Sequence, residues 1–172
     1  HSNTASFYFF FIYLHILKAL LFKSYHKQNT ILWFSGIIIF FLSAGTAFLG
    51  YVLPWGQMSL WGATVITNLI TAIPVVGKIV VIWIWGGFSI SNATLNRFFV
   101  LHMVLPFAIL GLIISHILIL HEKGSSSPLG TFLTTDKIAF FPYYVYKDIF
   151  GLFCFFIILI LFISFSPNFL VG

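Results

Sequence analysis

The segment LNRFFVLHMVLPFAILGLIISHILIL (residues 95–120) decides the fold, because it is almost wholly apolar and yet contains two histidines. A hydrocarbon core about 30 Å thick requires about 20 apolar residues per helix. Lipid offers the backbone no hydrogen-bond partners, so a segment of this kind must be helical. His102 and His116 are therefore ionisable residues inside a membrane span, where burial is costly and a functional role is the default expectation.

The composition of the whole chain agrees with a membrane protein. The 172 residues are 60% hydrophobic and 6% charged, whereas a soluble domain has about 25% charged residues. The net charge is +5, but the basic residues lie in short loops between apolar runs. They therefore indicate topology and not a nucleic-acid partner. The single cysteine, Cys154, lies in an apolar run and is expected to be a buried, inert thiol.

Three further apolar stretches, 5–22, 31–53 and 143–165, are long enough to span the bilayer. The sequence thus predicts an all-α membrane protein with four transmembrane helices, over about 1–22, 31–53, 95–121 and 143–165, within one partial domain, 1–172. The chain opens inside an apolar run and without methionine. We therefore expect a further segment to precede it.

The connection 54–94 is apolar but broken by glycine and proline. Its two pieces, PWGQMSLWGATVITNLITAIP (54–74) and VVGKIVVIWIWGGF (75–88), are each poorly suited to crossing the membrane. We expect short helices at the membrane surface or folded back into the protein. The alternative is a fifth span over 75–88.

The distribution of basic residues orients the four spans. Six of the eight fall on one side of the membrane: Lys18, Lys23, Lys27, Lys123, Lys137 and Lys147. Lys78 and Arg97 fall on the other side. The richer side is predicted to be the matrix or cytoplasmic side.

The four histidines in the spans form two pairs with the same i, i+14 spacing. One pair is His1 and His15, and the other is His102 and His116. Nearly four helical turns separate the members of a pair, so they share a face and lie about 21 Å apart along the axis. The first and third spans run in the same direction, which places His1 level with His102 and His15 level with His116. Each level offers two imidazoles, as bis-histidine ligation of a haem iron requires.

Glycines in the second span repeat this spacing, since Gly36 and Gly50 are also an i, i+14 pair. A glycine gives a flat macrocycle room against a helix, although small residues also permit close helix packing. Zinc is a poor alternative, because two histidine pairs about 21 Å apart cannot form one tetrahedral site. The four helices are therefore expected to form a haem-binding bundle.

Several segments resemble one family over nearly the whole chain. They are HSNTAS (1–6), GYVLPWGQMSLWGATVITNL (50–69), WIWGGFSISNATLNRFFVLHMVLPF (83–107), HEKGSSSPLG (121–130) and DKIAFFPYYVYKDIFG (136–151). The sequence resembles the mitochondrial cytochromes b, the haem subunits of the quinol–cytochrome c oxidoreductase (complex III). By this resemblance the spans are the family's second to fifth helices. The family's first helix, its last three helices and its PEWY segment are not in the chain.

The resemblance implies the haem sites. His1 and His102 would hold a low-potential b haem on the positive side, and His15 and His116 a high-potential b haem on the matrix side. Lys18 and Arg97 are further cofactor-binding candidates. The family usually has arginine where this chain has Lys18, which keeps the charge but loses the two-pronged contact with a haem propionate.

The resemblance also implies two quinone sites. The quinol-oxidation pocket would include Phe48, Gly62, Val65 and Ile66. The quinone-reduction pocket would include His121, Ser125, Lys147 and Asp148, with His121 and Asp148 handling protons. From the residues alone, the favoured interpretation of Lys147 and Asp148 is that they are interfacial anchors at the start of a helix. Phe141 replaces a histidine that the family often has, so no proton role is expected there.

The implied function is that of a di-haem subunit of complex III. Ubiquinol would be oxidised on the positive side, and electrons would pass through two b haems to a quinone on the matrix side, coupled to proton translocation. The implied partners are the Rieske iron–sulfur protein, cytochrome c1, the other complex III subunits, a second cytochrome b and lipid, with no nucleic acid. The expected location is the mitochondrial inner membrane, with a bacterial plasma membrane as the alternative. The competing functions are a structural or transporter subunit and a di-haem anchor of another quinone-linked dehydrogenase.

Overall fold

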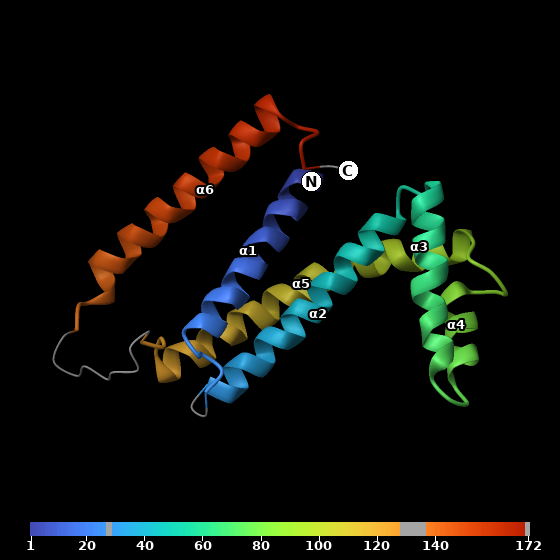
Figure 1. Cartoon of the computed structure of the whole chain (residues 1–172), viewed down its shortest axis with the longest axis horizontal. Coiled ribbons are helices and arrows are strands. Elements are labelled where there is room, and N and C mark those ends of the chain that lie inside the picture. Colours follow the sequence, from blue (N-terminus) through green and yellow to red (C-terminus); the bar gives the residue numbers. More distant parts are fainter. Residues whose placement is uncertain (27–28, 128–136, 171–172) are drawn as a thin grey trace. The chain divides into compact units, whose positions relative to one another are not determined.

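A computed structural model describes residues 1–26, 29–127 and 137–170, and the regular elements within these ranges are all helical (Figure 1). Four of the helices are long and apolar enough to cross a membrane, which confirms the predicted fold class. They are α1 (Ser2–Leu21), α2 (Thr30–Val52), α5 (Asn92–Lys123) and α6 (Val145–Phe165), the last preceded by a π-helical turn, η3 (Phe140–Tyr144). Lys27, residues 128–130 and Asp136, which entered the topology and the resemblance, lie outside the described residues.

Helix α5 is longer at both ends than its apolar stretch predicts. It begins at Asn92, where the backbone N–H of Ser91 donates to the Thr94 hydroxyl at 3.1 Å. A polar side chain that satisfies a backbone donor in this way allows a helix to start before its apolar residues. Pro106 lies inside the helix without ending it, as is common in membrane helices.

The connection between the second and third spans forms three short helices. They are α3 (Gln57–Asn68), η2 (Leu69–Ala72) and α4 (Gly77–Trp85). With 9 residues, α4 is about 14 Å long, roughly half of the hydrocarbon thickness. It ends at Gly86, whose φ of 74° is the left-handed conformation that suits glycine. The prediction of short helices is confirmed, and the alternative of a fifth span is wrong.

The chain divides into two compact units, and each is described by itself. In the unit Ile31–Glu122, α2 and α5 run antiparallel, because Phe48 stacks edge-on against Phe98 at 5.9 Å while Ser35 meets His116 further along (Figure 1). The core of this unit is small and lies where α2, α3 and α5 meet. Its buried members are Leu49, Val52, Ala63 and Phe98.

Hydrogen bonds hold the short helices of this unit in place. The Trp85 indole N–H donates to the Thr67 hydroxyl at 2.8 Å, which ties α4 to α3. The Thr94 hydroxyl donates to the Trp85 carbonyl at 2.7 Å, which ties α4 to α5. The Ser59 hydroxyl donates to the Tyr51 carbonyl at 2.7 Å, which fixes the turn from α2 into α3.

The second unit contains His1–Thr30 and Lys123–Gly172. Within it α1 and α6 are antiparallel, with Phe7 against Phe162 at 5.3 Å and Phe11 against Phe155 at 5.2 Å. The buried Asn3 amide donates to the Pro167 carbonyl at 3.0 Å. The start of α1 is therefore fastened to the segment that follows α6 (Figure 1).

Replacing Thr94 by valine is expected to lower the free energy of unfolding by about 1–3 kcal/mol. Thr94 is fully buried, and its hydroxyl serves both the Trp85 carbonyl and the Ser91 N–H. Valine keeps the shape but leaves both groups without this partner. Denaturant unfolding of the detergent-solubilised protein measures the loss. Thr71→Val is the control, because the exposed Thr71 hydroxyl bonds within its own segment; equal losses in the two variants would contradict the assignment.

Candidate haem-binding site

His102 lies on the face of α5 that meets α2. Its Nδ1 is 2.8 Å from the Thr46 carbonyl oxygen. A carbonyl oxygen can only accept, so Nδ1 carries the hydrogen and the lone pair of the neutral ring is on Nε2. A histidine in this tautomer is suited to bind iron through Nε2, with the Nδ1 hydrogen bond fixing the plane of the ring.

His116 is held in the same tautomer by a different group. Its Nδ1 is 2.7 Å from the Ser35 hydroxyl oxygen, and that hydroxyl lies 2.8 Å from the Leu32 carbonyl. The Leu32 carbonyl can only accept, so it takes the single hydroxyl hydrogen of Ser35. The Ser35 oxygen therefore accepts from His116 Nδ1–H, and again the lone pair of the ring is on Nε2.

Both imidazoles press against the glycines that share their spacing. A Cβ built on Gly50 would stand 2.5 Å from Cε1 and 2.9 Å from Nδ1 of His102. A Cβ built on Gly36 would stand 3.3 Å from Cε1 of His116. The glycine spacing therefore corresponds to a real register between α2 and α5. What each glycine directly accommodates in this structure is the histidine ring.

These observations fit b-type haem. Two imidazoles on one face of α5 are fixed in the tautomer that a metal needs, and each lies against a glycine of α2. The other two candidate ligands belong to α1, where His1 is the N-cap residue and His15 lies within the helix. Among the described residues no three His, Cys, Asp or Glu side chains cluster as a metal site.

The two basic cofactor candidates have partners of their own in the structure. The Lys18 ammonium lies over the Phe22 ring, 5.0 Å from its centroid. The Arg97 guanidinium donates to the carbonyls of Trp83 and Ile84 at the end of α4 and lies over the Trp83 ring. A contact between either residue and a haem propionate stays a prediction.

The residues predicted for quinol oxidation divide between two locations. Gly62, Val65 and Ile66 form one stripe along α3, and Val65 and Ile66 are exposed. The neighbouring stripe, Ser59, Ala63 and Thr67, is buried. Phe48 lies on α2, packed against the core cluster that contains Ala63.

The residues predicted for quinone reduction occur in both units. His121 is exposed in the last turn of α5, in the unit Ile31–Glu122. Ser125, Lys147 and Asp148 belong to the other unit, with Asp148 exposed in the first turn of α6.

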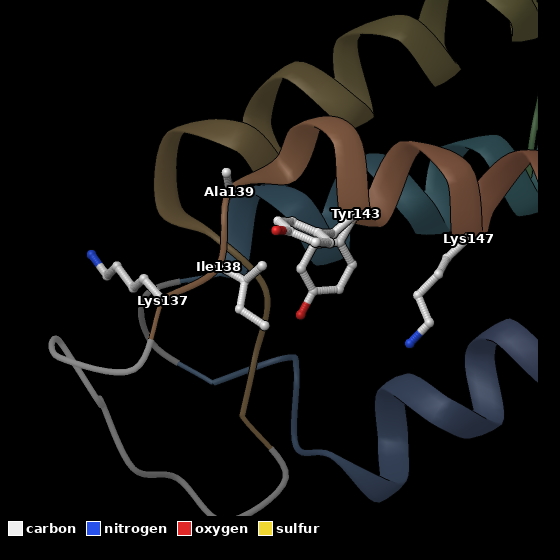
Figure 2. A pocket seen from close by; sticks show the side chains of 6 residues that line it. Lys137, Ile138, Ala139, Tyr143 and Lys147 are labelled. Carbon is white, nitrogen blue, oxygen red and sulfur yellow. The ribbon is translucent and has the colours of Figure 1, made fainter.

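A cavity of about 630 Å³ opens at the start of α6. Lys137 and Lys147 flank it on opposite sides, with Ile138 and Tyr143 between them (Figure 2). Ala139 and Tyr144 complete its lining. Small-molecule sites typically occupy about 300–1,000 Å³. Of the predicted quinone residues, Lys147 is the one that lines this cavity.

Sequence reasoning missed the two groups that hold the imidazoles, Ser35 and the Thr46 carbonyl. Ser35 carried a usable signal, since it is a polar residue inside an apolar span, directly before Gly36. The Thr46 carbonyl carried none, because the backbone is the same at every position.

Comparisons with known proteins identify the family of the chain. The family described as "Cytochrome b/b6/petB" matches residues 1–124. Cytochrome b of Phytophthora megasperma is 54% identical over 168 residues, which cover 98% of this chain and 44% of the relative. Cytochrome b of Neurospora crassa is 55% identical over 169 residues, again 98% and 44%. The chain thus spans less than half the length of these relatives.

A solved structure is similar as well. A chain described as "Hyperthermophilic respiratory Complex III" matches all of this chain and 48% of its own length, with a TM-score of 0.86 and 27% identity. The family match covers well over half of the 172 residues and includes all four candidate haem ligands. The chain belongs to the cytochrome b family, a family of haem-binding, multi-pass membrane proteins.

Proposed function

We propose that this chain forms the two-haem electron-transfer core of a quinol–cytochrome c oxidoreductase. The observation that carries the proposal is the register between α2 and α5. The two imidazoles of α5 both have Nδ1 held by an acceptor of α2, and both lie against a glycine. If the histidines only packed one helix against another, there would be no reason for the same acceptor and glycine contacts to occur twice, 14 residues apart.

His1 and His102 are proposed to ligate one iron, and His15 and His116 the other. This pairing rests on the common i, i+14 spacing and on the alternation of the spans, since α1 and α5 are the first and third membrane helices. When bound, a b haem accepts and gives up one electron without changing its ligands. The role of the four histidines is to hold the iron and set its electronic environment.

Quinol oxidation on the positive side is proposed to involve the stripe Gly62, Val65 and Ile66, together with Phe48. Exposed apolar side chains on one face of α3 suit the isoprenoid-bearing ring of a quinol. Quinone reduction on the matrix side is proposed for His121, Ser125, Lys147 and Asp148. The cavity beside Lys147 supports a small-molecule site there, and the imidazole and carboxyl groups would supply protons.

The partners, substrates and location of the chain are proposed from its family. The partners are the Rieske iron–sulfur protein, cytochrome c1, the remaining complex III subunits and a second cytochrome b. The substrates are ubiquinol and ubiquinone, and proton release and uptake occur on opposite sides. The location is the mitochondrial inner membrane, which the names of eukaryotic relatives support.

Single histidine-to-alanine variants in the assembled complex test the proposal. His15→Ala and His116→Ala should each remove the same higher-potential step from a redox titration of the visible b-type spectrum. His1→Ala and His102→Ala should each remove the lower-potential step. A histidine that holds the iron has no substitute in an apolar span, so the loss of that haem signal should be essentially complete.

His26→Ala is the matched control, because His26 lies in the turn that follows α1 and is expected to leave both steps intact. A wild-type complex without any b-type spectrum would contradict the proposal and favour a structural or transporter subunit. If His15→Ala and His102→Ala each removed the same step of the titration, the proposed pairing of the histidines would be overturned, but the binding of haem would not.

A further inference from the structure

The hydroxyl of Ser35 is a partly buried polar group inside the α2 span, and its oxygen contacts a candidate haem ligand. It lies 2.7 Å from His116 Nδ1. A serine in an apolar helix usually satisfies its hydroxyl by donating to a carbonyl of the preceding turn, and Ser35 does so toward Leu32 at 2.8 Å. That bond takes its only hydrogen, so the oxygen faces the imidazole as an acceptor.

The two imidazoles of α5 that are proposed as haem ligands therefore differ in their acceptors. His102 donates to a main-chain carbonyl, that of Thr46, which no substitution removes. His116 donates to a side-chain hydroxyl. The acceptor matters because a hydrogen bond at Nδ1 raises the basicity of the ligating nitrogen, and a more basic ligand stabilises the oxidised iron.

We propose that Ser35 is a positioning residue that fixes the ring of His116 and lowers the reduction potential of the haem that His116 binds. The proposal rests on the proposed function, since it requires His116 to be an iron ligand. It adds a side chain that tunes one haem and leaves the other unaffected.

Ser35→Ala in the assembled complex tests it by redox titration of the b-type spectrum. Without the acceptor, the imidazole donates less electron density to the iron, so the reduced haem becomes more stable relative to the oxidised haem. We expect the ratio of reduced to oxidised haem at a fixed ambient potential to rise about tenfold for the His116 haem only. For a one-electron couple this is a shift of about 59 mV. The low-spin ferric signal of that haem in electron paramagnetic resonance should move as well.

Two further variants keep the test decisive. Ser35→Thr retains the hydroxyl and should restore the wild-type potential. Ser115→Ala makes the same change directly beside His116, but the Ser115 hydroxyl bonds Gly111 in its own helix, so both potentials should stay unchanged. If Ser35→Ala lost the haem outright, its recovery in Ser35→Thr would still support the hydrogen bond.

Unchanged potentials in Ser35→Ala would overturn the proposal, as would loss of the haem in both the alanine and the threonine variants. Equal shifts of both haems would overturn it too. Failure of the proposed function is seen separately, as the absence of a haem that depends on His116 in the otherwise wild-type complex.

Discussion

Gly50→Ala is expected to abolish haem binding at His102, whereas Gly36→Ala should leave most of the haem at His116. The same methyl group is added at two equivalent positions of one helix. At Gly50 it would stand 2.5 Å from the His102 ring, and at Gly36 it would stand 3.3 Å from the His116 ring. Separations below 3.0 Å force a displacement, while 3.3 Å requires only a few tenths of an ångström.

The His102 ring cannot move away from such a methyl group without a cost in free energy. Its Nδ1 is bonded to the Thr46 carbonyl on the same helix as Gly50, one turn away. Moving the ring clear would break that bond, turn Nε2 from its direction and leave the partly buried Nδ1–H of His102 without this acceptor, at a cost of about 1–3 kcal/mol before any loss of iron ligation. In the wild-type protein, the His102 ring keeps both its close contact with Gly50 and its hydrogen bond to the Thr46 carbonyl.

Haem content and a redox titration of the two variants measure the difference. In Gly50→Ala the lower-potential step should fall at least tenfold in amplitude, while Gly36→Ala should retain its higher-potential step. Gly45→Ala is the control, because a Cβ there meets no atom within 4 Å. Equal losses at positions 36 and 50 would show that the register between α2 and α5 differs from the one described.

Asp148→Asn is expected to slow the reoxidation of the haem by quinone by about 10²-fold or more while leaving both haems in place. As an exposed residue in the first turn of α6, Asp148 could simply favour the positive end of the helix dipole. That role is worth only about 0.3–1 kcal/mol. Asparagine keeps the size and the hydrogen-bonding oxygen but cannot carry a proton, so a large kinetic loss would identify a proton-handling group.

Asp148→Glu is the matched variant, since it keeps the carboxyl and should recover most of the rate. The measurement follows haem reoxidation after a flash or rapid mixing in the intact complex. A near-normal rate in Asp148→Asn, with only a small loss of stability, would leave Asp148 as a helix anchor. The cavity beside Lys147 would then need another proton donor.

The membrane fold was largely predictable because hydropathy is a local property. The four spans appear as four helices, and the connection 54–94 forms short helices, as its glycines and prolines indicate. The errors occur at helix ends. The Thr94 hydroxyl extends α5 to Asn92 through a hydrogen bond that no hydropathy profile contains. Tyr143 and Tyr144, which the apolar stretch 143–165 includes, belong to the turn η3, and α6 begins only at Val145.

The candidate site was predictable as a set of residues but not as a set of contacts. The repeated i, i+14 spacing singled out the two histidine pairs and the glycine pair from the sequence. It did not show that the rings themselves fill the space beside Gly36 and Gly50. Nor did it show that Phe48 packs against Phe98 in the core, apart from the exposed stripe of Val65 and Ile66.

The sequence by itself determined that this chain contains four membrane spans, which histidines are candidate ligands, and to which family the chain belongs. Those properties depend on composition and on spacing along single helices. Only the tertiary structure decided that Thr46 and Ser35 hold the two imidazoles, across 56 and 81 residues of sequence. The physical reason is that a hydrogen bond tolerates only a few tenths of an ångström, so its partners follow from the register of α5 against α2, which no single helix encodes.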